Sequence, residues 1–420
     1  MECRMGDDRR LADLNTLLNV ARELGATTEL IPLLQRVESA TLQVLDCERA
    51  TVFLFDPSSD ELYSLVATGE ETIRFSAKRG IAGQALQSGS VINVADAYAD
   101  ERFNPEIDKA TGFRTRNLLT FPMAGHDGAT VGVLQALNKR GGPFDDSDEE
   151  LATTLAGLAG VAIQRQILLD EYAQKQKLEG DLSLAREIQQ RFLPKSDPKV
   201  DGYDIAGWNR PADETGGDCY DYVPLPDGRL GILLADATGH GIGPALIISQ
   251  CRATIRALAS LTGDIPSIIK PANHLVNQDV SSGRFVTTFF GALDPQRHIL
   301  EYFSAGHGPL LHYERRSGSC RELAADSYPL GILPEMDVSL PPPIVLQPGD
   351  AFILITDGFF EWQDPDGEQF GIERLNSLIH ENRDGSSIDL IRTMHSTVTT
   401  FSRGTPQTDD LTAVVIKRLL

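Results

Sequence analysis

The sequence lacks several features that mark common protein classes. Its five cysteines form no Cys-x-x-Cys pair, which favours buried or free thiols in a reducing compartment over a disulfide framework. The N-terminus, Met1-Glu2-Cys3-Arg4, has no apolar signal segment, and no apolar run approaches the length that spans a membrane. We therefore expect a cytoplasmic protein with no membrane partner.

Positive charge is also scarce. The formal net charge of -22 at pH 7 argues against nucleic acid as the main partner, because nucleic acid binds basic patches. An acidic enzyme that acts on phosphate must carry its positive charge locally, as metal. With 420 residues, 41% of them hydrophobic and 23% charged, the chain is globular in composition and long enough for two or three domains.

Acidic residues recur in the C-terminal half at the ends of expected strands. Asp236 and Asp357 each close an apolar run, Asp218 follows two glycines, and Asp409 opens an Asp-Asp-Leu-Thr segment. One such aspartate is most simply a turn or N-cap residue. Several together imply a neutralising cation, because an unpaired buried charge is costly, and their hard oxygen atoms favour Mg or Mn over zinc.

Apolar periodicity divides the chain into two domains and a connector. Residues 10–165 combine helical and strand-like stretches, as expected of a mixed domain with an antiparallel sheet. Residues 166–194 form an amphipathic helix that is either a connector packed on one neighbour or a parallel coiled coil. The short stripe leaves both interpretations open, and we expect a homodimer. From 195 to 420 many short strands alternate with four helices, expected near 244–261, 266–281, 371–382 and 386–402.

The C-terminal motifs resemble a known family. AREIQQRFLP (185–194), RPADETGGDCYDY (210–222), LADATGHG (234–241), LITDGFFE (354–361) and DDLTAVVI (409–416) occur in the order found in the metal-dependent (PPM) serine/threonine protein phosphatases of the SpoIIE/RsbU-like branch. The resemblance implies an α+β fold with an α-β-β-α sandwich at residues 195–420. It also implies hydrolysis of phosphoserine and phosphothreonine by a water that two Mn or Mg ions activate.

The resemblance assigns the metal ligands. Asp218 and Asp236 are implied ligands, with Asp236 bridging the two ions and the carbonyl of Ala237 completing one coordination sphere. Asp357 and Asp409 are implied to hold the other ion. The implied partner is a phosphoprotein, by family analogy an anti-sigma-factor antagonist.

The sequence departs from the wider superfamily in one respect that bears on mechanism. Animal members place a histidine two residues after the bridging aspartate, whereas His240 lies four residues after Asp236, so a general-acid role is not transferred. Arg210 is the nearest candidate for a basic phosphate-binding residue. Cys219 and His307 are expected to face the core.

Two other functions deserve comparison with this one. A ligand-sensing scaffold with an inactive phosphatase-like domain is disfavoured, because a decayed enzyme usually loses a metal ligand and this set is intact. A cyclic-nucleotide phosphodiesterase would need a cluster of histidine and aspartate ligands, whereas the eight histidines are scattered.

The N-terminal half resembles a GAF domain of the type found in cyclic-nucleotide phosphodiesterases and adenylyl cyclases. Asn138-Lys139, Phe144 and Asp148-Glu149 match the NKxxxxFxxxDE signature of that group, which implies an ion pair between Lys139 and Asp148 that braces a ligand pocket. A bound cAMP or cGMP is one expectation, and a GAF domain that binds nothing and only dimerises is the other. The candidate ligand contacts are Ile81, Ala82, Asp108, Thr111, Thr115 and Gln135.

Overall fold

The chain folds into two compact units, one ending at Lys177 and the other running from Leu178 to Leu420. The computed structural model describes residues 2–65, 73–280 and 283–420, and the side chains of residues 2–13, 107, 110 and 111 lie outside what it describes. Both units combine helices with antiparallel sheet, which confirms the expected α+β class.

The N-terminal unit is built on a six-stranded sheet with the strand order β3-β2-β1-β6-β5-β4. Every neighbouring pair is antiparallel, and β1 and β6 pair along most of their length. The strands are β1 (Cys47–Asp56), β2 (Glu61–Tyr63), β3 (Arg74–Ser76), β4 (Ile92–Val94), β5 (Leu118–Ala124) and β6 (Thr130–Lys139). The apolar run from Leu62 to Ala67 predicts a strand, but β2 ends at Tyr63, and residues 66 and 67 lie outside the described residues.

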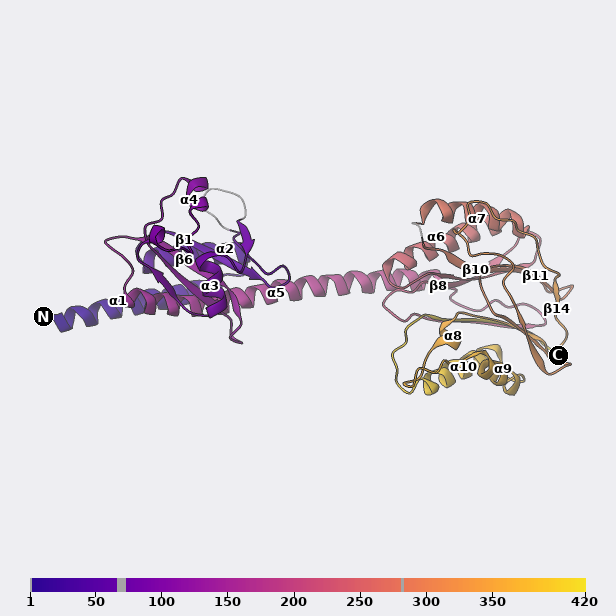
Figure 1. Ribbon diagram of the computed structural model, residues 1–420. Helices are drawn as coiled ribbons and strands as arrows, with labels where there is room; N and C mark the ends of the chain where they lie inside the picture. Colours follow the sequence, from indigo (N-terminus) through magenta and orange to yellow (C-terminus); the bar gives the residue numbers. More distant parts are fainter. Residues whose placement is uncertain (1, 66–72, 281–282) are drawn as a thin grey trace. The chain divides into compact units, whose positions relative to one another are not determined.

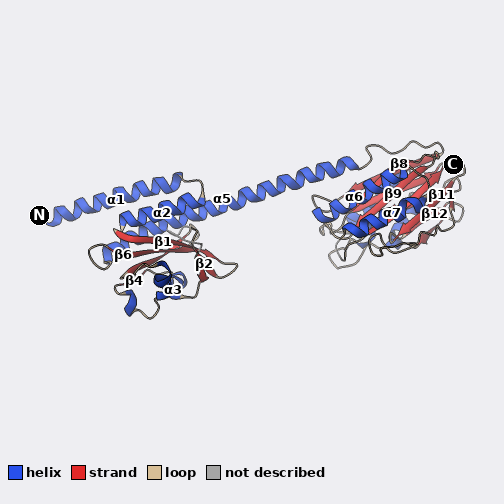
Figure 2. Cartoon of the chain, turned by 90° about the horizontal axis from the view of Figure 1, so that it is seen from above, coloured by secondary structure: helices blue, strands red, loops and turns tan. Residues whose placement is uncertain are grey.

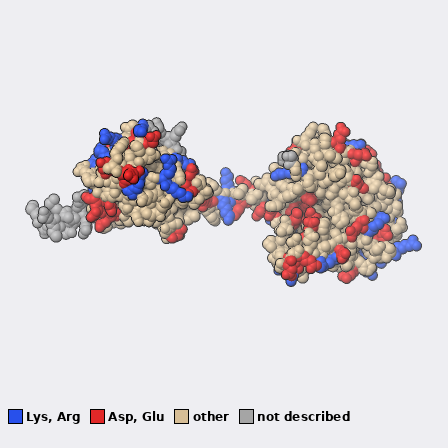
Figure 3. Space-filling view, in the orientation of Figure 1, with Lys and Arg blue, Asp and Glu red and all other residues tan. Residues whose placement is uncertain are grey.

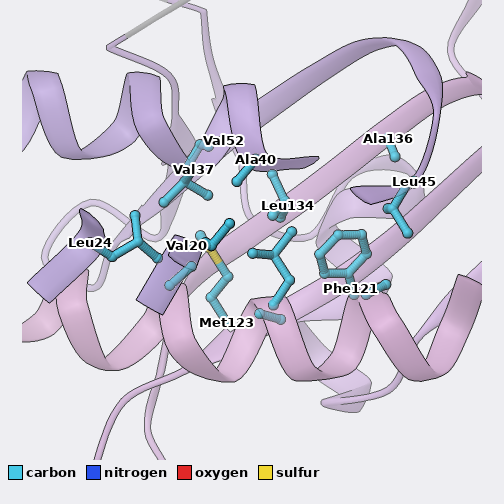
Figure 4. Close-up of a cluster of buried hydrophobic side chains, with 14 of the residues drawn as sticks. Val20, Leu24, Val37, Ala40, Leu45, Val52, Phe121, Met123, Leu134 and Ala136 are labelled. Carbon is cyan, nitrogen blue, oxygen red and sulfur yellow. The ribbon is translucent and has the colours of Figure 1, made fainter. Parts of the chain in front are cut away.

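Helices cover both faces of this sheet, as Figure 2 shows. Alternating side chains of β1 explain the arrangement, since successive residues of a strand point to opposite faces. Val52 and Leu54 pack in the larger core with α1, α2 and α5 (Figure 4), whereas Phe53 packs on the other face with α3. The helices are α1 (Glu2–Ala26), α2 (Leu30–Val44), α3 (Gly80–Ser88), α4 (Pro105–Thr111) and α5 (Asp146–Phe192), with a short 3-10 helix at Ala97–Ala99.

Helix α5 leaves the GAF-like unit and enters the second one without interruption. The sequence predicts helical patterns at 147–170 and from 164 to 194, and in the structure both belong to a single helix of 47 residues, with no proline inside it. Among the described residues it is the one helix long and apolar enough to cross a membrane, which differs from our expectation from the sequence. Its buried residues, among them Leu155 and Ile163, are core residues of the N-terminal unit.

The C-terminal unit contains two five-stranded antiparallel sheets. One has the order β14-β11-β10-β9-β8 and the other the order β13-β12-β15-β16-β7. The strands of the first sheet are β8 (Asp218–Pro224), β9 (Leu230–Ala237), β10 (Val286–Asp294), β11 (Ile299–Ala305) and β14 (Ile344–Val345). Those of the second are β7 (Tyr203–Arg210), β12 (Leu310–Glu314), β13 (Ser319–Leu323), β15 (Ala351–Ile355) and β16 (Leu411–Arg418).

The two sheets pack face to face between helices, which confirms the expected α-β-β-α sandwich (Figure 1). In β9, Ile232 and Leu234 point into the core between the sheets, while Leu233 and Ala235 point toward α6 and α7. A separate core lies between the second sheet and α8, α9 and α10. The helices are α6 (Ile242–Ala259), α7 (Ile265–Asp279), α8 (Gly358–Glu361), α9 (Ile372–Glu381) and α10 (Ser387–Phe401).

One helix boundary differs from the sequence expectation. We expected Pro244 to be the first residue of its helix, but α6 begins at Ile242. Proline is tolerated there because the N–H groups of the first helical turn have no partner within the helix.

Candidate functional site

Two of the implied ligands lie on adjacent strands. Asp218 opens β8 and Asp236 lies near the end of β9, and the two are paired across the antiparallel ladder. Asp218 is 4% exposed, and the Thr412 hydroxyl donates a 2.5 Å hydrogen bond to its Oδ2. The chain thus places two carboxylates side by side at one end of the first sheet.

The other two implied ligands, Asp357 and Asp409, lie next to the ends of strands in the second sheet. Asp357 follows β15 and Asp409 precedes β16, and these strands are antiparallel neighbours, so the two residues lie at the same edge. Asp357 is the N-cap residue of α8, but its side chain forms no capping hydrogen bond with that helix. Asp409 Oδ1 accepts a 2.8 Å hydrogen bond from the backbone N–H of Asp410.

Asp410 connects the two groups. Its carboxylate is buried and accepts hydrogen bonds from the backbone N–H of Ala212, at 2.7 Å, and of Asp218, at 3.2 Å. The family resemblance implies that Asp410 need not contact metal but leaves open which of Asp409 and Asp410 does so. In the structure Asp410 holds the segment that carries Asp218 against β16.

Three glycines of the motifs lie where a side chain would collide with neighbouring atoms. A Cβ at Gly217 would lie 2.7 Å from the carbonyl oxygen of Ala237 and 3.1 Å from that of Gly239. A Cβ at Gly216 would collide with the Asp410 carboxylate, and one at Gly358 with the Asp410 carbonyl. Only glycine allows the backbone to approach these oxygen atoms so closely.

The carboxylates are close enough to repel one another. Burial, followed by the charges of Asp236 and Asp410, raises the pKa of Asp218 well above its usual range. Burial and the charges of Asp357 and Asp409 raise the pKa of Asp236 to about 7. Burial, then Asp409 and Glu361, raise that of Asp357 to about 6. Asp236 thus connects Asp218 with Asp357 and Asp409 in a single acidic cluster.

This cluster fits hydrated hard cations better than a closed metal cage. Within residues 2–65, 73–280 and 283–420, no three side chains of His, Cys, Asp or Glu are arranged to hold a metal ion by themselves. Mg²⁺ commonly binds one or two carboxylates and keeps several waters, so it does not need three side chains at one point. The cluster offers only oxygen donors, which also suits Mn²⁺.

Two residues at the cluster were missed in the sequence. Glu361 lies four residues after Asp357 and raises its pKa, and this helical spacing could have revealed it. Gln189, in α5, accepts a 3.0 Å hydrogen bond from the N–H of Gly216 and donates a 2.5 Å bond to the Gly216 carbonyl. Nothing in the helical pattern distinguishes Gln189 from neighbouring polar residues.

The remaining candidates have other partners. His240 is exposed, and its Nδ1 lies 2.8 Å from Asp213 Oδ2. The Arg210 guanidinium is hydrogen-bonded to His395 Nε2 at 3.0 Å. Cys219 is buried, and desolvation raises the pKa of its thiol well above the usual range, so it is not a nucleophile.

The N-terminal candidate contacts are distributed over three elements and a loop. Ile81 and Ala82 are buried in α3, and Gln135 of β6 donates a 3.0 Å hydrogen bond to Thr120 Oγ1. Asp108 and Thr115 lie together, because the Thr115 backbone N–H and hydroxyl donate bonds of 2.7 and 2.8 Å to the Asp108 carboxylate. The Thr111 side chain lies outside the described residues.

The implied ion pair of this unit is confirmed. The Lys139 ammonium bonds to the Asp148 carboxylate, and both side chains are largely buried, at 15% and 7% exposed. The pair joins the end of β6 to the first turn of α5. It supports the C-terminal end of β6. There the side-chain oxygens of Asn138 and Asn117 also accept hydrogen bonds from backbone N–H groups.

Comparison with known proteins agrees with this geometry. Residues 226–419 match the family model of stage II sporulation protein E (SpoIIE), and residues 29–163 match that of the GAF domain. The chain is a GAF domain followed by a SpoIIE-type phosphatase domain. It is accordingly a protein serine/threonine phosphatase, as the sequence predicted.

Individual relatives match different parts of the chain. Phosphoserine phosphatase RsbU of Bacillus subtilis (strain 168) is 28% identical over 247 residues, which are 58% of this chain and 72% of RsbU. Probable 3',5'-cyclic phosphodiesterase pde-5 of Caenorhabditis elegans is 30% identical over 172 residues, 37% of this chain but only 24% of that protein. The solved SiaA-PP2C domain of Pseudomonas aeruginosa shares the fold of the SpoIIE-type unit, with a TM-score of 0.51 and 23% identity over 59% of this chain and 98% of that domain.

Proposed function

We propose that this chain is a signal-regulated phosphatase that removes phosphate from phosphoserine or phosphothreonine of a regulatory protein, an anti-sigma-factor antagonist. One observation carries the proposal: four aspartates from distant segments gather at one edge of the sandwich, where burial and neighbouring carboxylates raise the pKa values of Asp218, Asp236 and Asp357. The resemblance to phosphoserine phosphatase RsbU supports the substrate class.

Each residue of the cluster has a proposed role in metal binding. Asp236 would bridge two Mn or Mg ions, with Asp218 and the Ala237 carbonyl on one ion and Asp357 and Asp409 on the other. The ions would supply an activated water and neutralise charge on the phosphoryl oxygens. Asp410 holds the Asp218 backbone in place, and glycine at position 217 avoids a Cβ that would lie 2.7 Å from the Ala237 carbonyl oxygen.

Mutation of the cluster tests the activity. We expect Asp236→Asn and Asp357→Asn each to abolish Mn- or Mg-dependent hydrolysis of a phosphorylated antagonist peptide and of a generic phosphate ester. Asp201→Asn, at an exposed turn of the same unit, is the matched control and should keep full activity. Activity that persists in both cluster variants would favour the alternative of an inactive phosphatase-like scaffold.

The GAF domain is the proposed sensor, and α5 the proposed transmitter. A small ligand, cAMP or cGMP, would contact Ile81, Ala82, Asp108, Thr111, Thr115 and Gln135. The Asp108–Thr115 pair is a polar group at this position that a ligand could rearrange. At the other end of α5 the paired bonds of Gln189 to Gly216 connect the helix to the backbone beside Asp218.

Calorimetry and kinetics test the regulation separately. Titration of cAMP and cGMP into concentrated protein should release heat, and Thr115→Val should weaken that binding without changing basal phosphatase activity. Gln189→Ala should leave nucleotide binding intact and remove its effect on the phosphatase. Absence of heat with both nucleotides would remove the proposed effector and leave the phosphatase assignment unaffected.

Assembly and compartment complete the proposal. We place the GAF sensor at 10–165, the linker at 166–194 and the phosphatase at 195–420, in a cytoplasmic homodimer. Apolar side chains exposed along α5, such as Leu168, Leu169 and Tyr172, support a helical dimer contact. The four cysteines with described side chains are free thiols, which suits a reducing compartment. Sedimentation of the intact chain and of Leu168→Glu tests the dimer.

A further inference from the structure

A cavity of about 290 Å³ lies between the end of α5, β8 and α6, within the C-terminal unit. It is distinct from the aspartate cluster, because Asp221 lines it while Asp218 belongs to that cluster. The two residues are three apart on β8, so their side chains leave the strand on opposite faces. The neighbours of Asp221 on its face, Cys219 and Val223, pack toward α6.

The cavity is rich in positive charge in a chain of net charge -22. Its lining includes four cationic side chains, Arg191, Lys195, Arg252 and Arg256, and a single acidic one, Asp221. Figure 3 shows acidic and basic side chains side by side on the visible face of the C-terminal unit, whereas the cavity lining is mostly basic.

The single carboxylate of the cavity, that of Asp221, already accepts hydrogen bonds from protein donors. Asp221 is 2% exposed, and its Oδ1 accepts bonds from Arg256 Nη1 at 2.7 Å and from the Tyr222 N–H at 2.8 Å. Its Oδ2 accepts from Arg256 Nη1 at 2.8 Å and pairs with Arg252 Nη2 at 2.8 Å. Asp221 therefore fixes both arginines in place but neutralises only one positive charge.

Both arginines keep donors that these bonds do not use. Arg256 makes all its described bonds through Nη1, and its side chain is 46% exposed. Arg252 Nε is buried and has no hydrogen-bond partner among the described residues. The Arg252 guanidinium lies 5.8 Å from the centre of the Phe192 ring, which helps to orient it. A buried donor without an acceptor is costly, and no acceptor of the described residues offsets that cost for Arg252 Nε.

We propose that this cavity binds a phosphate group, either free inorganic phosphate or one carried by a small metabolite. Arginine donors in a fixed planar fork match the oxygens of phosphate, and Lys195 at the rim adds a point charge. The volume admits a phosphate with a small organic part, near the lower end of ligand pockets. The bound group would join the end of α5 to α6, the helix that follows the loop after Asp236.

Calorimetry in EDTA tests this site, because chelation removes any metal at the aspartate cluster that could recruit phosphate. Inorganic phosphate, pyrophosphate and AMP are titrated into the full chain at constant ionic strength. We expect saturable binding of at least one of them, with one site per chain. Tighter binding of AMP identifies an organic phosphate as the ligand, and tighter or equal binding of inorganic phosphate identifies the free ion.

Variants locate the binding. Arg256→Gln and Lys195→Gln should each weaken it roughly ten-fold or more, as expected for loss of a charge-assisted bond. Because Arg256→Gln weakens the contacts of buried Asp221, Lys195→Gln on the exposed rim serves as the variant that keeps the fold. Arg392→Gln, on α10 and 72% exposed, should bind like the native chain. No saturable heat with all three anions, binding unchanged in both variants, or binding of an acidic peptide in their place would overturn the proposal.

Discussion

Asp218 and Asp236 are cross-strand partners on β8 and β9, and the charge of Asp236 helps to raise the pKa of Asp218. Without a cation this arrangement destabilises the fold, because burial and like charge both oppose ionisation. A divalent ion bound between these carboxylates would neutralise their repulsion. The metal and the folded state are therefore linked, and the linkage can be measured.

The first prediction concerns stability without metal. We expect Asp218→Asn to melt at a higher temperature than the native chain in EDTA, because the isosteric amide removes one buried charge. Each kcal/mol of relieved repulsion should raise Tm by about 2–4 °C for a domain of this size. Saturating Mg²⁺ should stabilise the native chain and have little effect on the variant. Asp201→Asn, on an exposed turn, should match the native chain in both conditions.

The second prediction concerns the close contact at Gly217. Gly217→Ala places a methyl group 2.7 Å from the Ala237 carbonyl oxygen, so the loop must move away from the proposed ligand. We expect loss of most phosphatase activity and weaker Mn²⁺ affinity in a chain that still folds. Gly157→Ala, in α5 with nothing near the added methyl, is the control and should be neutral or stabilising by about 0.5–1 kcal/mol. Full activity in Gly217→Ala would contradict the assignment of this carbonyl.

The third prediction concerns the GAF ion pair. Lys139→Met leaves the Asp148 carboxylate buried without its counter-charge, which costs about 3–5 kcal/mol when a buried pair is broken. Both tryptophans, Trp208 and Trp362, lie in the C-terminal unit, so their fluorescence reports only that unit. Circular dichroism should therefore show an earlier transition that fluorescence does not follow. Lys78→Met, at an exposed pair whose lysine is 71% exposed, should shift neither signal.

The fourth prediction concerns acid. Burial lowers the pKa of His307 from 6.5 to about 4, so protonation favours the unfolded chain. The contribution of neutral His307 to stability is fully present above pH 6.5 and is lost as the pH falls from 6.5 to about 4, by roughly 3 kcal/mol. Urea unfolding at several pH values should show this loss in the native chain and a smaller one in His307→Asn. The exposed His274→Asn should follow the native chain.

Much of the C-terminal architecture could be predicted because its signals are local. Strands that alternate between two cores, such as β9, show their faces in the sequence, and glycines beside each aspartate mark close backbone approach. The continuous helix α5 was not predicted as one element, because the pattern changes where the helix leaves the core of the first unit. Apolar periodicity changes where a helix leaves one core, and in the sequence such a change looks the same as the end of one helix and the start of another.

The contacts made across the chain could not be predicted. Asp410 bonds to the backbone of Ala212, and Gln189 to that of Gly216, and each bond joins segments that no local pattern relates. In the sequence Arg252 and Arg256 look like ordinary charged residues of a helix. Only the fold brings them next to Asp221. The resemblance identified the family because it compares whole motifs, whereas spacing alone identified single aspartates.

Gln189 binds both polar atoms of the Gly216 backbone with one side-chain amide, and this limits how α5 can turn. Advancing the helix by a single residue rotates a side chain by about 100° around the axis, which would break both bonds together. A change in the twist of the linker would therefore break or restore the Gln189 bonds to Gly216 without requiring either sheet to change its pairing.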